Sequence, residues 1–254
     1  MNKTVLITGA SSGLGKDFAI LFAEKGYDLV LTARRKKNLE EIRNNLINQF
    51  GIKAYIISRD LSDLKSTEEI YNFCEENKIQ INVLVNNAGY GLKDSFEKIS
   101  LSDHIDFINV LSTSAIALTR LFLPGMIKRK FGRIINISSV AAFAPFTNSG
   151  GMYIATKLML LKFSEMIHND YKNKNIFSCS VCPGFTHTEF HNEMKEFKSS
   201  IPSFMWMESR TVVEQAYEAS MSGKEIIING WRYKILVFFM KITPKWLVKL
   251  LSGR

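Results

Sequence analysis

A short apolar segment that runs directly into a glycine-rich turn is the feature that most constrains the fold. Residues 4–7 are Thr-Val-Leu-Ile, without polar alternation, which predicts a strand buried on both faces. Residues 8–15 follow as Thr-Gly-Ala-Ser-Ser-Gly-Leu-Gly, and apolar residues then recur at helical spacing up to Lys25-Gly26. A strand, a glycine turn and a helix in this order form an anion site, because helical N–H groups and the helix dipole point at the turn. The missing side chains let a pyrophosphate approach the backbone.

The rest of the chain alternates between strand-like and helix-like segments. Further strands are expected at residues 28–32, 54–58, 82–85, 133–138, 176–181 and 225–228, and helices at 37–48, 63–77, 101–130, 152–173 and 210–221. Asp63 is expected to cap its helix. This order predicts an α/β fold, a Rossmann-like doubly wound, seven-stranded parallel sheet with helices on both faces. No linker or repeat divides residues 1–254, so we expect a single domain.

Composition narrows the classes of function. The net charge is +9, but Lys and Arg are scattered and no arginine-rich run with interleaved aromatic residues occurs, which disfavours nucleic acid. The three cysteines, Cys74, Cys179 and Cys182, lack metal-ligand spacing, and we expect reduced thiols in a cytoplasmic protein without a metal site. No signal-peptide pattern is present, and no apolar stretch is expected to reach the ~18 residues of a membrane span.

The carboxyl ends of the expected strands gather the informative residues, and ligands of such sheets bind at these ends. A carboxylate after the second strand would repel a 2′-phosphate, but residues 32–35 are Thr-Ala-Arg-Arg. A guanidinium binds phosphate through a bidentate fork, so Arg34 favours NADP(H) over NAD(H). Arg35, Lys36 and Lys37 are interpreted as the solvated start of a helix.

A second group of residues carries acid–base chemistry. Tyr153 and Lys157 are four residues apart on an expected helix and therefore share one face. A nearby ammonium would lower the tyrosine pKa and make the phenol a usable general acid. The preceding strand ends in Ser138-Ser139, where a hydroxyl can hydrogen-bond a substrate carbonyl oxygen.

Together these segments resemble the short-chain dehydrogenase/reductase family, from residue 3 to about residue 190. The motifs are Thr8 to Gly15, Asn86-Asn87-Ala88-Gly89, Asn136-Ile137-Ser138-Ser139, Tyr153 to Lys157 and Pro183-Gly184. The resemblance implies that Ser139 orients the substrate oxygen, Tyr153 donates the proton and Lys157 lowers the tyrosine pKa and binds the nicotinamide ribose. It implies that Asn109 holds a water in the proton relay.

The resemblance also implies a set of cofactor-binding residues. They are Gly9, Ser11, Ser12, Gly13, Leu14, Gly15, Arg34, Asp60, Leu61, Asn87, Ala88, Gly89, Tyr153, Lys157, Pro183, Gly184, Thr186 and Thr188. Two features depart from the family pattern. The segment between Ser139 and Tyr153 is one residue longer, through residues 148–151, and Ala142 stands where glycine is common. The first departure leaves either Ser138 or Ser139 for the catalytic role, and we choose Ser139.

Two apolar segments remain. Residues 190–208 are rich in Met, Phe and Trp and predict either a lid over a hydrophobic substrate or packing on the core; Phe143 and Phe146 could line the same pocket. Residues 230–254 form an apolar C-terminal extension with flanking lysines. It suits a subunit interface of a homo-oligomer, closure of the pocket or peripheral membrane contact, and we favour the first two.

The expected function is an NADPH-dependent oxidoreductase that reduces a ketone or aldehyde of a hydrophobic small molecule, or runs in reverse. The alternative is a non-catalytic NADP(H)-binding regulator or membrane-associated scaffold. The tyrosine and lysine favour the enzyme, because a binding module does not need them.

Overall fold

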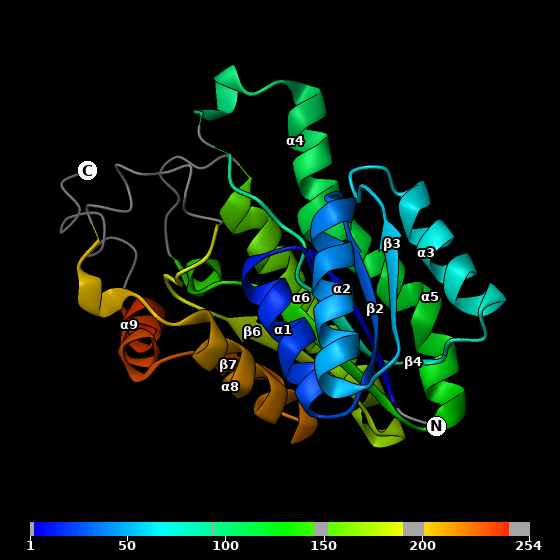
Figure 1. The fold of residues 1–254 in the computed structure, drawn as a ribbon. Helices are drawn as coiled ribbons and strands as arrows, with labels where there is room; N and C mark the ends of the chain where they lie inside the picture. The colour runs from blue at the N-terminus through cyan, green and yellow to red at the C-terminus, as the bar shows by residue number, and fades with distance from the viewer. Residues whose placement is uncertain (1–2, 93, 145–151, 190–200, 244–254) are drawn as a thin grey trace.

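The computed structural model describes residues 3–92, 94–144, 152–189 and 201–243. Its centre is one parallel sheet with the strand order β3-β2-β1-β4-β5-β6-β7 (Figure 1). The strands are β1 (Thr4–Thr8), β2 (Asp28–Ala33), β3 (Ala54–Ser58), β4 (Ile81–Asn86), β5 (Gly132–Ile137), β6 (Ile176–Cys182) and β7 (Ile226–Ile228). The predicted seven-stranded doubly wound sheet is therefore confirmed. The strand order runs outward to one side from β1 to β3 and to the other side from β4 to β7. The point between β1 and β4 where the order reverses is where such sheets bind their ligands.

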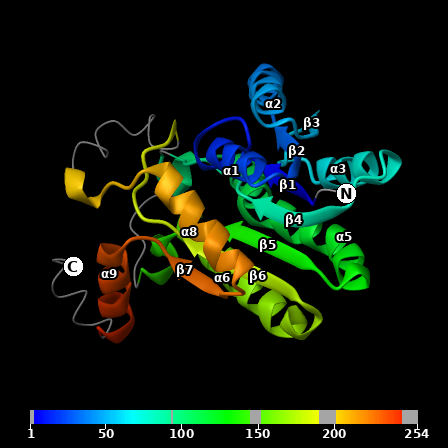
Figure 2. The same ribbon diagram turned by 60° about the horizontal axis from the view of Figure 1, so that its bottom comes forward.

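Helices cover both faces of the sheet (Figure 2). They are α1 (Gly13–Glu24), α2 (Lys36–Phe50), α3 (Lys65–Glu76), α4 (Leu101–Ile108), α5 (Ser114–Arg129), α6 (Tyr153–Tyr171), α8 (Ser209–Met221) and α9 (Trp231–Ile242). Phe18, Leu39 and Val212 from α1, α2 and α8 share one core cluster with the sheet. Ile70, Leu118 and Ile167 from α3, α5 and α6 share the other. Burying apolar side chains on each side is what holds the two layers against the sheet.

The long helix predicted over 101–130 is interrupted. Between α4 and α5 the chain forms a π-helical segment, η2 (Asn109–Thr113), in which the Ser114 N–H donates to the carbonyl oxygen of Asn109. A π-helical turn is rare and often marks a functional site. The change in hydrogen-bond register separates α4, which projects from the body of the molecule in Figure 1, from α5 against the sheet.

The helical run 101–129 corrects one sequence expectation. It is long and apolar enough to span a membrane by length and composition alone. However, half of its most apolar window is buried inside the domain, and Leu118, Phe122 and Met126 pack in the core beside α3. The helix is apolar because these side chains lie in the core of the domain.

Asp63 lies beside the start of α3 but is not its N-cap, which corrects the sequence prediction. Asp63 accepts a hydrogen bond from the Lys65 N–H (3.0 Å), although Leu64 occupies the N-cap position itself. This contact satisfies one of the N–H groups that every helix leaves unpaired at its start.

Candidate active site

The glycine turn between β1 and α1 is shaped for close approach. Gly9 has φ +65°, and a Cβ built there would lie 2.9 Å from the Ala88 Cα. A Cβ on Gly15 would lie 2.2 Å from the Gly9 carbonyl oxygen. Only glycine fits at these two positions, so the sequence pattern is a direct consequence of how the turn packs on the end of β4.

Side chains at the ends of β1 and β4 hold this turn. The Thr8 hydroxyl accepts hydrogen bonds from the N–H groups of Asn87 (2.9 Å) and Ala88 (3.0 Å). The Asn87 side-chain amide donates to the carbonyl oxygen of Thr8 at 2.9 Å and to that of Gly9 at 3.3 Å. Asn87, predicted to touch the cofactor, thus acts here on the turn.

A cleft lies at the carboxyl ends of β1, β2, β3 and β4. Its lining contains eight predicted residues: Gly9, Ser11, Ser12, Arg34, Asp60, Leu61, Ala88 and Gly89. It also contains residues the sequence reasoning did not assign: Ala33, Arg35, Arg59, Tyr90 and Val110. Gly13 and Gly15 lie at the start of α1, and Leu14 packs on the core beside the sheet.

Two arginines after β2 face this cleft. Arg34 Nη1 lies 3.9 Å from Asp60 Oδ2, and its guanidinium lies 6.0 Å from the centre of the Tyr90 ring. Arg35 donates to the hydroxyl oxygens of Ser11 (3.1 and 3.2 Å) and Ser12 (2.6 Å). Arg35 does stand at the start of α2 and its side chain is 49% exposed, as the interpretation of a solvated helix start expects, but its guanidinium also turns back onto the glycine turn.

Arg35 also reaches across the cleft. Its Nη1 lies 3.0 Å from a carboxylate oxygen of Glu189, which belongs to the loop after β6. Its guanidinium therefore already holds hydroxyl and carboxylate oxygens, the groups that a phosphate resembles in its hydrogen bonding. The position of Arg35 after the strand was the only sequence signal for this role.

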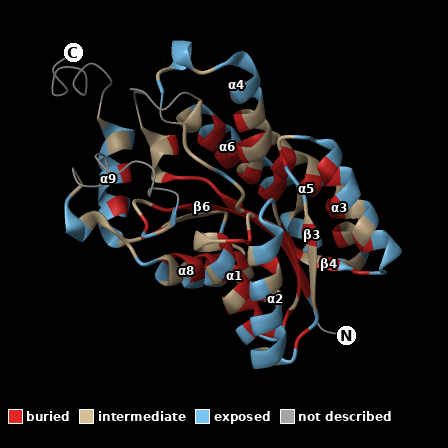
Figure 3. Ribbon diagram, turned by 45° about the horizontal axis from the view of Figure 1, so that its top comes forward, coloured by how far each residue is buried: buried red, intermediate tan, exposed pale blue. Residues whose placement is uncertain are grey.

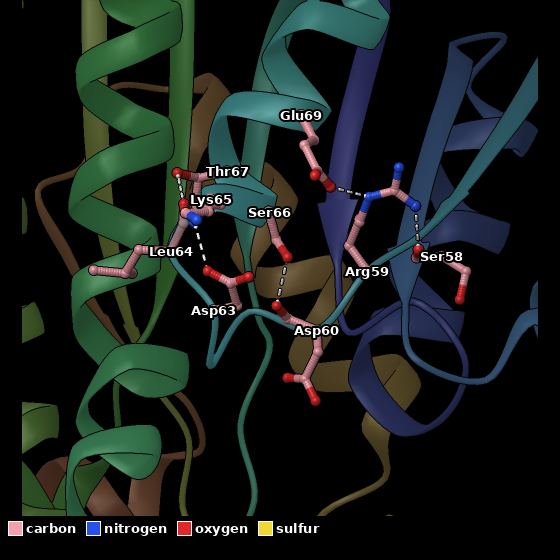
Figure 4. A network of polar contacts seen from close by, with 9 residues as sticks. All are labelled: Ser58, Arg59, Asp60, Asp63, Leu64, Lys65, Ser66, Thr67 and Glu69. Atoms are coloured by element: carbon pink, nitrogen blue, oxygen red, sulfur yellow. Dashed lines mark hydrogen bonds and ion pairs between the residues drawn. The ribbon is translucent and has the colours of Figure 1, made fainter. Parts of the chain in front are cut away.

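The loop that carries Asp60 is fixed by a network of polar contacts (Figure 4). The Ser66 hydroxyl donates to the Asp60 carbonyl oxygen (2.6 Å), and Thr67 donates to that of Leu64 (2.7 Å). Arg59 forms an ion pair with Glu69 of α3. With the backbone held by these bonds, the Asp60 side chain points away from the network toward the cleft, where its carboxylate accepts a hydrogen bond from the Ser62 N–H (3.0 Å) and faces Arg34.

Ser139, Tyr153 and Lys157 come together from β5 and α6. Ser139 follows β5 and caps the short helix η3 (Val140–Phe143), its Oγ accepting from the Ala141 N–H at 3.1 Å. The Ser139 hydroxyl also forms a hydrogen bond with the Tyr153 phenol. Lys157 lies on the same face of α6, with Nζ 5.7 Å from the centre of the Tyr153 ring. The sequence left either Ser138 or Ser139 for the catalytic role, and the hydrogen bond to Tyr153 favours Ser139.

Ser138 has a structural role rather than a contact with the Tyr153 phenol. Its hydroxyl donates to the Lys157 carbonyl oxygen at 2.8 Å, and the residue is 2% exposed. It therefore joins β5 to α6 beneath the site. Buried Cys182 lies beside it, at the end of β6.

Burial sets the protonation of the tyrosine and lysine. Desolvation raises the pKa of the Tyr153 phenol, and the hydrogen bond from Ser139 offsets part of that rise. Desolvation also lowers the pKa of Lys157 to about 8. The Lys157 ammonium donates to the Ile137 carbonyl oxygen at 2.8 Å rather than to the phenol. The expected lowering of the Tyr153 pKa is therefore not found: its pKa is raised.

Asn109 begins the π-helical segment. Its side-chain amide donates to the Ser62 carbonyl oxygen at 3.0 Å and so ties η2 to the loop after β3. Val110, the next residue, lines the cleft. Asn109 is thus at the edge of the site, held by the protein, and its role in a water relay stays a prediction.

The loop after β6 lies over the glycine turn. A Cβ on Gly13 would lie 3.2 Å from the Thr188 Cβ, so Thr188 stands beside the start of α1. The Thr186 hydroxyl donates to the Gly184 carbonyl oxygen (3.0 Å), and this buried side chain holds the loop. Residues 185–187 also pair with Met207 through backbone hydrogen bonds.

Tyr233 of α9 holds this loop from below, a role for which the sequence carries no signal. The Tyr233 hydroxyl accepts from the Phe185 N–H (2.9 Å) and donates to the Met205 carbonyl oxygen (2.6 Å). A Cβ on Gly184 would lie 1.9 Å from the Tyr233 ring. The C-terminal extension therefore packs on the Pro183-Gly184 motif. Residues 190–200, most of the predicted lid, lie outside the described residues, as do residues 145–151 with Phe146 and residues 244–254.

The residues present fit a dinucleotide. The turn leaves no room for side chains at Gly9 and Gly15, the cleft beside it is lined by arginines and an aspartate, and the acid–base group lies after β5 on the same edge of the sheet. Within the described ranges, no group of three or more His, Cys, Asp or Glu side chains could hold a metal ion.

Comparisons with known proteins show the family to which the chain belongs. The family model described as short chain dehydrogenase matches residues 3–199. The chain belongs to this family and is an oxidoreductase acting on CH–OH or C=O groups.

Individual relatives refine the picture. The chain is 32% identical to the very-long-chain 3-oxoacyl-CoA reductase of Rattus norvegicus, over 98% of this chain and 83% of that protein. It is 33% identical to the NADP-dependent 3-hydroxy acid dehydrogenase of Schizosaccharomyces pombe, over 74% of this chain and 73% of the relative. A short-chain dehydrogenase from Sphingobium yanoikuyae in complex with NADPH superposes with a TM-score of 0.83 at 28% identity, covering 95% and 96% of the two chains. The last two names contain NADP or NADPH, the cofactor that the sequence predicts.

Proposed function

We propose that the protein is an NADPH-dependent reductase of a ketone or aldehyde carried by a hydrophobic small molecule. The observation that carries this proposal is the junction of Ser139, Tyr153 and Lys157 at the edge of the sheet that also bears the glycine turn. A binding module or scaffold has no use for a protonated phenol hydrogen-bonded to a serine beside a buried lysine.

The chain's own groups account for the proton side of the reaction. The Ser139 hydroxyl can turn to donate to a substrate carbonyl oxygen, and the Tyr153 phenol, whose pKa burial raises further above neutrality, can deliver a proton to it. With a pKa of about 8, Lys157 is mostly charged at neutral pH, and its ammonium favours the phenolate that the transfer leaves behind. NADPH, when bound, supplies the hydride.

The preference for NADPH over NADH rests on the arginines after β2. Arg34 and Arg35 both line the cleft where β2 ends, and Asp60 is the carboxylate facing Arg34 there. Two guanidinium groups attract a 2′-phosphate, whereas a dinucleotide with a free 2′-hydroxyl gains little from them. The names of the S. pombe relative and the Sphingobium structure support the same choice.

An apolar substrate is favoured by what surrounds the loop after β6. The Phe185 and Trp206 rings lie 5.7 Å apart, and His187 stacks on Trp206 at 5.0 Å. Met207 pairs with the loop as well. The name of the rat relative, a reductase of very-long-chain 3-oxoacyl-CoA, supports an apolar substrate beside these aromatic side chains.

Oxidation of NADPH by a panel of carbonyl compounds tests this function. Aliphatic 3-oxo compounds of increasing chain length should be reduced with kcat/KM rising over the series, because each buried methylene contributes about 0.8 kcal/mol. Small polar sugars of equal carbonyl reactivity are the control. Turnover of the sugars with no turnover of the apolar series would contradict the proposal.

We also propose a homo-oligomer. On the outer face of α6, Leu158, Met159 and Met166 are 42%, 42% and 50% exposed. At about 100° per residue they fall on one side of the helix, and a stripe of this kind is commonly covered by another subunit. Sedimentation equilibrium of the wild type and of Met159→Glu tests it, since the charge should shift the protein toward monomer.

A further inference from the structure

Helix α9 presents two opposite faces. The first packs on the domain through Tyr233 and Val237, which are 2% and 1% exposed and lie one turn apart. Because Tyr233 also bonds to Phe185 and Met205, this face is fully engaged. Figure 3 shows the helix at the margin of the molecule, with exposed parts in pale blue beside short buried parts in red.

The second face is an exposed apolar stripe. At about 100° per residue, Trp231, Ile235, Phe238 and Ile242 fall within about 60° of one another on the side opposite Tyr233. They are 64%, 49%, 59% and 57% exposed. A helix that turns one apolar stripe inward and a second outward has a partner for the second, because large apolar side chains gathered in one exposed patch mark an interaction site.

Basic residues border this outer stripe on both sides. By the same angular spacing, Lys234 and Lys241 fall on one border and Arg232 on the other, and the Lys241 ammonium also lies 4.8 Å from the centre of the Phe143 ring of the domain. Arg232 lies 4.8 Å from the centre of the Trp231 ring and 5.7 Å from that of exposed Phe204. Residues 226–254 contain six Lys or Arg and no Asp or Glu, so they carry six of the nine net positive charges of the chain.

We infer that the outer face of α9 docks on an anionic lipid surface. An apolar stripe flanked by Lys and Arg is the pattern of a helix that lies in the plane of a membrane interface, with aromatic side chains among the acyl chains and ammonium groups at the phosphates. A second copy fits less well. A two-fold contact would bring the basic borders of two α9 helices together, and α9 holds no carboxylate to pair with them.

Docking would place the bilayer next to the substrate loop. The inner face of α9 holds Phe185 and Met205, so the lipid surface would lie one helix diameter from the loop after β6. A hydrophobic substrate could then enter directly from the membrane. This consequence, unlike the docking itself, rests on the proposed function.

Co-sedimentation of the full chain with vesicles tests the inference. Vesicles of phosphatidylcholine with 30% phosphatidylserine should bind the wild type about 10²-fold more tightly than pure phosphatidylcholine, since three cations border the stripe. Ile235→Glu should weaken binding to the anionic vesicles by about tenfold. The matched control is Ile105→Glu on α4, which makes the same change at 48% exposure against 49% and should bind as the wild type does.

Three results would overturn the inference. One is a wild type that stays in the supernatant with anionic vesicles. Another is equal binding by Ile235→Glu and Ile105→Glu, both checked for folding by NADPH affinity. The third is an Ile235→Glu variant that dissociates a dimer in sedimentation velocity, because that assigns the stripe to a second copy. Tyr153→Phe should bind vesicles as the wild type does. Vesicle binding therefore tests the docking of α9 independently of whether the proposed enzymatic function is correct.

Discussion

At the scale of single residues, the site depends on how burial treats the tyrosine and the lysine. Their spacing made them recognisable in the sequence, because residues four apart share a helix face. Their pKa values were not recognisable, because desolvation depends on β5, β6 and the serines packed around them. The sequence favoured a lowered pKa for Tyr153, and the structure has a raised one.

The lysine gives a prediction about pH and stability. Its pKa is lowered from 10.5 to about 8, so between these values the unfolded chain binds more protons than the folded one. Stability therefore rises with pH across this window, by about 3 kcal/mol in total, and is lost again as pH falls through 8. Lys157→Met removes this rise. Urea unfolding of both proteins from pH 7 to 10.5 measures it, and parallel curves would contradict it.

The arginines after β2 give a prediction about the cofactor. Arg34→Ala and Arg35→Ala should each weaken NADPH binding by about tenfold and change NADH binding little, because only the phosphate uses the guanidinium. Lys37→Ala is the control, since it removes the same charge from an exposed residue outside the cleft lining. Fluorescence titration with each dinucleotide measures the effect. Equal losses for both dinucleotides would exclude a phosphate contact.

At the scale of elements, the sequence revealed strands more readily than the way helices meet. A short continuous apolar segment such as residues 4–7, followed at once by a glycine turn, favours a buried strand by its length and its flanking residues. The long helix looked uniform, because a π-helical turn is a change in hydrogen bonding that side-chain spacing does not encode. The position of α9 depends on a contact between residues far apart in the chain, the Tyr233 ring packed on Gly184. The spacing of residues within α9 does not reveal this contact.

That fit gives a prediction about α9. Tyr233→Phe keeps the ring but leaves the Phe185 N–H and Met205 carbonyl without their shared partner, which should lower the free energy of unfolding by about 1–3 kcal/mol. The loop that carries Thr188 should loosen, so KM for NADPH should rise more than kcat falls. Tyr71→Phe, on α3 against Phe122, is the matched control. A Tyr233→Phe variant with unchanged KM and stability would show that the hydroxyl does not hold the loop.

At the scale of the whole molecule, the alternation of strands and helices was enough to predict the sheet and to place the cleft at its carboxyl edge. Parallel strands require crossover helices, and right-handed crossovers leave few arrangements. The relation between distant segments was beyond that reasoning. Arg35 reaching Glu189, and α9 beneath the loop after β6, join residues far apart in the chain.

The central claim is that a protonated phenol at Tyr153 delivers the proton to the reduced oxygen. The most direct measurement follows NADPH binding and NADPH oxidation together in Tyr153→Phe, with the best carbonyl substrate of the wild type. The account predicts an NADPH affinity within about twofold of the wild type and a kcat lower by about 10²-fold or more. A variant that binds NADPH and still turns over at the wild-type rate would contradict it.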